Sequence, residues 1–143
     1  MKRIALVLAG LALGLSAVVV HADSIDDSKA AMKAIGGATG LGAKIAKGEE
    51  PFDAAKVQGI FKTYIEAGKT FEGLFPANSK TGNTIASPKI WEDAAGFKAA
   101  LVKFEADATA GAAASTDLAS FRTAFGAVTK NCGSCHESFR IKR

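Results

Sequence analysis

The most regular pattern of apolar positions lies near the end of the chain. From residue 118 to residue 139, apolar and cysteine side chains recur at alternating intervals of three and four residues, which is typical of one buried face of a helix. The positions are Leu118, Phe121, Phe125, Val128, Cys132, Cys135 and Phe139. We predict a helix that opens at Ser115 or Thr116, both capping residue types, and that turns both cysteines towards the interior.

Two further stretches of helical spacing occupy the first half of the chain. The first spans residues 25–47 and ends at Gly48. The second begins at Asp53, a residue type that favours helix N-caps, and extends to about Phe75. Its apolar positions keep the same three-and-four spacing: Val57, Ile60, Phe61, Tyr64, Ile65, Gly68, Phe71 and Phe75.

A polar loop over residues 76–88 separates these stretches from another helix, which is predicted to start at residues 91–93 and to end near residue 114. Its inward positions are Phe97, Leu101, Phe104 and Ala108. No stretch shows the period-two alternation of a half-buried strand. Because mostly short connections favour antiparallel neighbours, the sequence predicts an all-α fold, an antiparallel up-down-up-down four-helix bundle.

The pentapeptide Cys132-Gly133-Ser134-Cys135-His136 lies on the predicted last helix. Cys-x-x-Cys-His is the attachment signature of c-type haem. Residues three apart share a helical face, so both thiols can reach the two vinyl groups of one porphyrin. The following His136 can then bind the iron as an axial ligand. We therefore predict one covalently bound haem c inside the bundle.

Other uses of these cysteines fit less well. A thioredoxin-like dithiol follows a strand in a βαβ unit, whereas the segment before Cys132 has helical spacing. A structural zinc site takes four Cys or His ligands, and the chain after residue 22 contains two Cys and one His. A disulfide is possible in an oxidising compartment but leaves His136 without a role.

Glycine is frequent in the first two predicted helices, where each interior glycine costs about 0.5–1 kcal/mol relative to alanine. Close contact between helices, packing against a second subunit and space for a porphyrin are all compatible with this composition. The positions are Gly36, Gly37, Gly40, Gly42, Gly59, Gly68 and Gly73.

Residues 1–22 have the features of a cleaved secretory signal peptide. Lys2 and Arg3 precede an apolar run over residues 4–20, and Val20-His21-Ala22 forms a small-x-Ala cleavage site. A retained membrane anchor is the alternative, because the run approaches the shortest length that spans a bilayer. We predict export to the periplasm and one four-helix-bundle domain over residues 23–143.

Charge and composition argue against nucleic-acid binding, binding to anionic lipid and catalysis. The chain has 18 basic and 14 acidic residues, and two of the basic residues lie in the predicted leader. The lysines are scattered, so neither nucleic acid nor anionic lipid is indicated as a partner. Catalysis is not indicated either, because no second His remains for acid–base work at the iron and no carboxylate pair has an evident substrate cleft.

The sequence does not decide which residue lies on the side of the iron opposite His136. Loss of the leader removes His21, and Met32 is then the one remaining methionine. Met32 can wall the pocket opposite His136, bind the iron as a sixth ligand, or fill a gap in a remote part of the core.

The order of several short motifs resembles the family of cytochrome c prime (cytochrome c′), the class II c-type cytochromes. The resemblance covers nearly all of residues 23–143, and its motifs are specific in this order and spacing. They are residues 32–37 (MKAIGG), 52–55 (FDAA), 74–76 (LFP), 88–91 (PKIW) with Phe97, 121–126 (FRTAFG), 132–136 (CGSCH) and Phe139-Arg140.

The resemblance implies a four-helix bundle with one covalent haem and five-coordinate, high-spin iron. It implies that Met32 occupies the position that blocks the distal haem face, that Phe75 belongs to the distal pocket, and that Arg140 lies near the proximal imidazole. Many members carry Arg-Gln where this chain has Ser28-Lys29. Lys29 is therefore the candidate for the haem propionate contact, without the bidentate geometry of arginine.

The function implied by the resemblance is binding of nitric oxide and carbon monoxide at a crowded distal face, with some electron transfer to redox partner proteins. Family members also often form homodimers through the first two helices. The alternative is a low-spin electron carrier of the same fold, with His136 and Met32 both on the iron.

Overall fold

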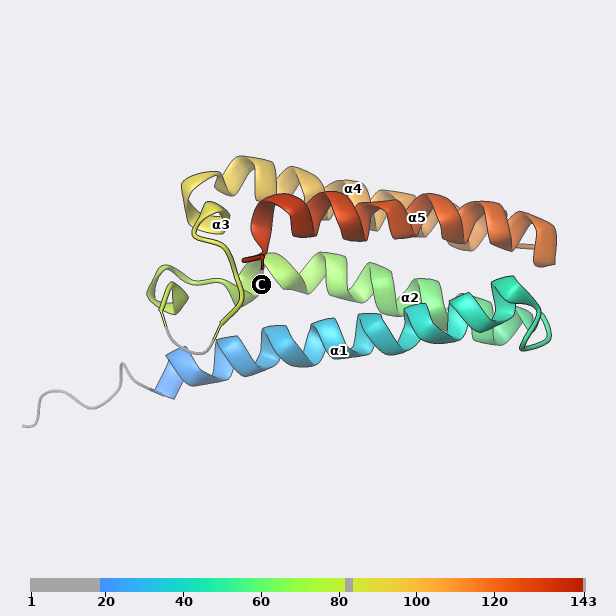
Figure 1. Ribbon diagram of the computed structural model, residues 1–143, viewed down its shortest axis with the longest axis horizontal. Helices are drawn as coiled ribbons and strands as arrows, with labels where there is room; N and C mark the ends of the chain where they lie inside the picture. Colours follow the sequence, from blue (N-terminus) through green and yellow to red (C-terminus); the bar gives the residue numbers. More distant parts are fainter. Residues whose placement is uncertain (1–18, 82–83, 143) are drawn as a thin grey trace, which may run out of the picture.

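The structure is a computed structural model that describes residues 19–81 and 84–142, without the side chains of residues 19–23 and 78. Four long helices lie side by side, and neighbours in the chain run in opposite directions (Figure 1). The predicted four-helix bundle is confirmed. The long helices are α1 (Val19–Lys47), α2 (Ala54–Phe71), α4 (Ala94–Ala114) and α5 (Leu118–Phe139).

Three short elements lie between α2 and α4 and gather at one end of the bundle (Figure 1). They are the 3₁₀ turns η1 (Glu72–Leu74) and η2 (Ala77–Ser79), and the single helical turn α3 (Lys89–Glu92). The second helix was predicted to reach Phe75, but the α-helix ends at Phe71 and tightens into η1. The third was predicted to start at residues 91–93, and α4 begins at Ala94 with Asp93 as its N-cap, while the single turn α3 before it was not predicted.

Aspartate side chains cap three of the long helices. Asp53 accepts a hydrogen bond from the Lys56 amide at 2.8 Å, as predicted for the start of α2. The predicted start of α5 at Ser115 or Thr116 is wrong, because Asp117 is its N-cap and shares a capping box with Ser120. Ser115 instead follows the last turn of α4, where its hydroxyl donates to a backbone carbonyl.

The apolar faces of the helices form two clusters of buried side chains. One fills the middle of the bundle: Ile45, Val57, Ile60, Phe61, Tyr64, Ala108, Phe121, Phe125 and Val128. The other lies at the end that carries the short elements: Phe71, Ile90, Phe97 and Leu101. Most of the predicted inward positions of α2, α4 and α5 fall in these clusters, which confirms the periodicity that defined them.

The glycines of α1, α2 and η1 have two different surroundings. A Cβ atom at Gly42 would collide with the ring of Phe125, and one at Gly68 would lie 3.0 Å from the Cβ of Glu105. Close helix contact therefore explains these two positions. It is the wrong explanation for the other five, because a Cβ there would meet nothing within 4 Å. These five are Gly36, Gly37, Gly40, Gly59 and Gly73.

The one tyrosine of the chain predicts a loss of stability at high pH. Tyr64 is 1% exposed, and burial raises the pKa of its phenol to about 12. The 2.8 Å hydrogen bond with Thr39 lowers this pKa, but by less than burial raises it. Because the folded-state pKa is raised, the neutral phenol stabilises the fold below pH 10, and this is lost as pH rises from about 10 to about 12. Two pKa units correspond to about 2.7 kcal/mol of unfolding free energy.

Denaturant unfolding as a function of pH measures this loss, and Tyr64→Phe is the control. The variant should lack the part of the alkaline destabilisation that belongs to the phenol. Equal pH dependence in the two proteins would contradict the assignment.

Candidate functional site

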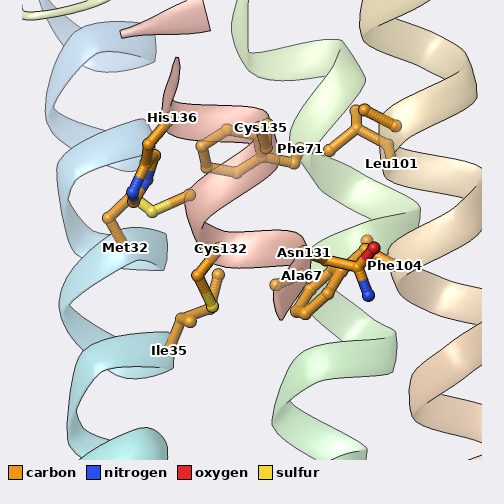
Figure 2. A pocket seen from close by; sticks show the side chains of 12 residues that line it. Met32, Ile35, Ala67, Phe71, Leu101, Phe104, Asn131, Cys132, Cys135 and His136 are labelled. Atoms are coloured by element: carbon orange, nitrogen blue, oxygen red, sulfur yellow. The ribbon is translucent and has the colours of Figure 1, made fainter. Parts of the chain in front are cut away.

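The last turns of α5 carry the Cys-x-x-Cys-His motif to a pocket enclosed by the four long helices (Figure 2). Cys132 and Cys135 are free thiols, and each side chain is half-buried. We call this space the inner pocket. Its lining residues are Met32, Ile35, Ala67, Gly68, Phe71, Ala100, Leu101, Phe104, Asn131, Cys132, Cys135 and His136. Except for Asn131 and His136, all of these are apolar or carry sulfur.

A second space, which we call the outer hollow, adjoins the inner pocket at the end of the bundle. It has a volume of about 290 Å³. Met32, Phe71, Cys135 and His136 line both spaces. The other lining residues of the outer hollow are Ser28, Lys29, Phe75, Thr84, Ile85, Ala86, Ile90, Phe97, Phe139 and Arg140. Lysine, arginine and hydroxyl side chains therefore line the outer hollow but not the inner pocket.

Aromatic rings build the wall of the outer hollow. The Phe75 ring lies 5.1 Å from that of Phe71 and 5.4 Å from that of Phe97, and the Phe97 ring lies 5.3 Å from that of Phe139. These edge-to-face contacts hold the rings in fixed positions. Trp91 adds an anchor, because its indole Nε1 donates to the Phe75 carbonyl at 3.0 Å.

The ionisation of the motif suits covalent attachment and metal ligation. Burial raises the pKa of both Cys132 and Cys135, so the thiols stay protonated at neutral pH. Burial, followed by the positive charge of Arg140, lowers the pKa of His136. The imidazole is therefore neutral at physiological pH and offers a free nitrogen lone pair.

Met32 faces the motif from the opposite side of the cavity. In Figure 2 its side chain projects from α1 towards α5, and the His136 imidazole projects from α5 towards α1. Lys29 and Phe75 lie in the outer hollow only, and Lys29 also pairs with Asp26 at 3.6 Å. The structure thus places all the predicted site residues in the walls of these two adjoining spaces.

Arg140 reaches the outer hollow through a contact between distant parts of the chain. Its backbone forms an antiparallel bridge with Ala86. The Ser87 amide donates to the Phe139 carbonyl at 3.0 Å, and the Ile141 amide donates to the Ile85 carbonyl at 2.8 Å. The loop before α3 therefore holds the C-terminal residues beside the imidazole.

The residues present fit a c-type haem. Two thiols lie three residues apart on one helix, beside an imidazole and apolar walls, and two basic side chains stand where the cavity opens. Among the described residues, no three His, Cys, Asp or Glu side chains gather as a metal-binding cluster.

Sequence reasoning did not identify Asn131 or Ile35 as site residues, and it assigned Phe71, Leu101 and Phe104 only to the core. The three large apolar residues were detectable, because they share helical faces with positions already assigned inward. Asn131 gave no signal, because nothing in the periodicity indicates that a polar residue beside the interior face is buried.

The predicted signal peptide, residues 1–22, falls almost wholly outside the described residues, and α1 begins at Val19. In the part of the chain that is described, no helix combines the length and apolarity needed to cross a membrane.

Comparison with known proteins gives a consistent result. A family model described as Cytochrome C′ matches residues 23–140. The chain is 42% identical to a cytochrome c′ of Rhodopseudomonas palustris, over 99% of this chain and 97% of that protein. It is 40% identical to a cytochrome c-556 of Agrobacterium fabrum, over 87% of this chain and 86% of that protein.

Solved structures agree. A cytochrome c′ from Rhodopseudomonas palustris superimposes with a TM-score of 0.81 at 44% identity, covering 85% of this chain and 98% of that one. The nitric oxide complex of a cytochrome c prime variant from Alcaligenes xylosoxidans superimposes with a TM-score of 0.76 at 28% identity, covering 85% of this chain and 96% of that one.

Proposed function

Because the chain belongs to the cytochrome c′ family of c-type haem cytochromes, we propose that it binds nitric oxide and carbon monoxide at a haem whose distal face is crowded by Met32. Some electron transfer to a redox partner protein accompanies this role, and the chain is not an enzyme. The nitric oxide complex of the Alcaligenes xylosoxidans relative supports the ligand class.

In this proposal one haem is held by thioether links to Cys132 and Cys135, with His136 as the axial iron ligand. The haem supplies an iron centre that binds diatomic gases and exchanges one electron. His136 is neutral at physiological pH and can bind a metal through a ring nitrogen. Lys29, Phe75 and Arg140 line the outer hollow. Lys29 would contact a haem propionate, Phe75 would belong to the distal pocket, and Arg140 would act beside the imidazole of His136, whose pKa its charge lowers.

The observation that carries the proposal is the composition of the inner pocket. Met32 lines it opposite His136, and no Lys, Arg, Tyr, Ser or Thr side chain shares its wall. The amide of Asn131 also lines it, but its Nδ2 already donates to Asp107 and to the Val128 carbonyl. Met32 and its apolar neighbours therefore offer no hydrogen bond to a bound diatomic ligand that needs a distal donor. Nitric oxide and carbon monoxide depend less on such a donor, so an apolar wall selects for them.

The alternative is a low-spin electron carrier in which Met32 is the sixth iron ligand. The similarity to a cytochrome c-556 and the position of the Met32 thioether opposite His136 both support it. The two functions differ in one contact, that between the Met32 sulfur and the iron.

Absorption spectra of the purified ferric and ferrous protein test the choice. We expect high-spin bands in both oxidation states and a shift of the ferrous spectrum on addition of carbon monoxide. A far-red Met–iron charge-transfer band, with no response to carbon monoxide, would establish the electron carrier instead. A pyridine haemochrome assay showing no c-type haem would overturn both.

The proposal includes export to the periplasm after removal of residues 1–22. The family match begins at residue 23, immediately after the predicted cleavage site, and supports this boundary. It also includes a homodimer through α1 and α2. Gly36, Gly37 and Gly40 of α1 and Gly59 of α2 are exposed and leave open space around their Cα atoms, so a second subunit could approach closely.

A further inference from the structure

The residue that precedes the attachment motif is buried and makes a partly buried hydrogen bond to another helix. Asn131 is 8% exposed, and its Nδ2 donates to an Asp107 carboxylate oxygen of α4 at 2.8 Å and to the Val128 carbonyl at 3.1 Å. The Lys103 ammonium donates to the same carboxylate oxygen at 2.6 Å. Of the side-chain hydrogen bonds in the described residues, the Asn131–Asp107 bond is the one that joins α4 to α5.

In the turns of α5 that carry the attachment motif, apolar packing alone does not fix the rotation of the helix about its own axis. Between Val128 and Phe139, the α5 side chains that line the inner pocket are those of Asn131, the two cysteines and His136, and the last three are only half-buried. Gly133 and Ser134 between the cysteines are exposed. Two or three turns of the helix therefore lack a fully buried apolar side chain that would hold one face inward.

Asn131 and Cys132 project from different sides of the helix. Figure 2 shows Asn131 on the side of α5 that faces α4, and Cys132 on the side that faces α1. Adjacent residues of an α-helix are about 100° apart around its axis, so a contact that holds one of them also determines the direction of the other. Fixing Asn131 against α4 therefore keeps the Cys132 thiol in the inner pocket.

We propose that Asn131, held by Asp107, is a positioning residue that sets the rotation of α5 so that Cys132 faces the vinyl group to which it becomes linked. This inference rests on the proposed haem attachment. A single buried polar residue is an established means of fixing helix register and orientation. The Lys103 and Asn131 hydrogen bonds lower the pKa of Asp107, so the acceptor is anionic at neutral pH and the bond is charge-assisted.

The chemistry of attachment makes Cys132 the sensitive position. Each thiol adds its S–H across a vinyl double bond: the sulfur bonds to the carbon next to the ring and the hydrogen goes to the terminal carbon, with no net oxidation. The addition requires the sulfur to lie close to the vinyl carbon. Cys135 is nearer to Phe139, which packs on Phe97 and is held by the backbone bridge, so its direction depends less on Asn131.

The test is Asn131→Leu in the full chain, produced in a host that matures c-type cytochromes. Leucine has the same branched arrangement of side-chain heavy atoms as asparagine, although it is larger, and it has no hydrogen-bond donor. Alkylation of unlinked thiols under denaturing conditions, followed by peptide mass spectrometry, gives the fraction of haem-bearing chains with an unlinked Cys132. We expect at least about a tenfold increase over the wild type, because a hydrogen bond to a charged acceptor biases a conformational population by roughly tenfold to a hundredfold.

Matched variants separate positioning from general destabilisation. Asp107→Ala should behave as Asn131→Leu, and it carries the same test if that variant does not fold. Asp107→Asn keeps a carbonyl acceptor for Asn131, so the attached fraction at Cys132 should stay near the wild-type value in this variant. Thr39→Val removes the 2.8 Å hydrogen bond to Tyr64 between α1 and α2 and should leave attachment unchanged.

Equal Cys132 attachment in the wild type, Asn131→Leu and Asp107→Ala would overturn the inference and leave the proposed function intact. An equal loss in Thr39→Val would also overturn it, because the effect would then be one of overall stability. A wild-type chain with no haem at either cysteine would instead refute the proposed function.

Discussion

Chains with both motif cysteines replaced, Cys132→Ala/Cys135→Ala, are expected to accumulate without covalently bound haem. These two cysteines carry the only thiols of the chain, and both lie in the wall of the inner pocket. Haem staining of a denaturing gel and intact mass measure the loss directly. We expect no detectable stain and a mass without the added cofactor.

The same variant is expected to unfold over a broad temperature range. The cluster at the site end of the bundle surrounds a cavity, so without haem its rings lose packing partners, whereas the central cluster stays filled. A loss of several kcal/mol would lower the unfolding midpoint by more than about 10 °C, since roughly 1 kcal/mol shifts the midpoint by about 4 °C in a domain of this size. Circular dichroism during heating measures the transition.

Ser134→Ala is the matched control for both measurements. Ser134 lies inside the motif, is exposed, and its hydroxyl donates only to backbone carbonyls of α5. Attachment and the thermal midpoint should stay at the wild-type values. A haem-free double variant with a sharp, native-like transition would show that the helices pack without the cofactor.

The parts of the fold that could be predicted are those in which neighbouring residues decide the outcome. The three-and-four spacing of Phe121, Phe125 and Val128 defines a buried face without knowledge of any other helix. The capping role of Asp53 is equally local, because its side chain bonds to an amide three residues away. The motif cysteines were predicted to face inward because they continue the same face of α5.

The parts that could not be predicted depend on residues that are distant in the sequence. The bridge between Ala86 and Arg140 joins a loop to the chain end, and neither segment alone indicates the other. The burial of Asn131 is compensated in part by Asp107 of another helix, which accepts one of its hydrogen bonds. Gly42 and Gly36 look alike in the sequence, yet only Gly42 lies against a ring of α5.

Met32→Ala is expected to accelerate carbon monoxide binding to the ferrous protein by roughly tenfold to a hundredfold. Met32 lines both the inner pocket and the outer hollow and packs against the cluster at the site end of the bundle. Displacing a partly buried methionine side chain should cost about 1–3 kcal/mol, which is less than the cost of removing a fully buried one. If that displacement limits entry, each 1.36 kcal/mol removed from the barrier gives a tenfold faster rate. Flash photolysis or stopped-flow mixing measures the association rate.

Met32→Leu makes the same experiment decide between the two proposed functions. Leucine keeps an apolar side chain of similar size in the cavity wall but has no sulfur to bind iron. If Met32 acts as a steric wall, Met32→Leu should bind carbon monoxide nearly as slowly as the wild type, while Met32→Ala is fast. If Met32 is an iron ligand, both variants should be fast to a similar extent, because both remove the thioether. An association rate that is the same in all three proteins would show that Met32 does not control access to the site at all.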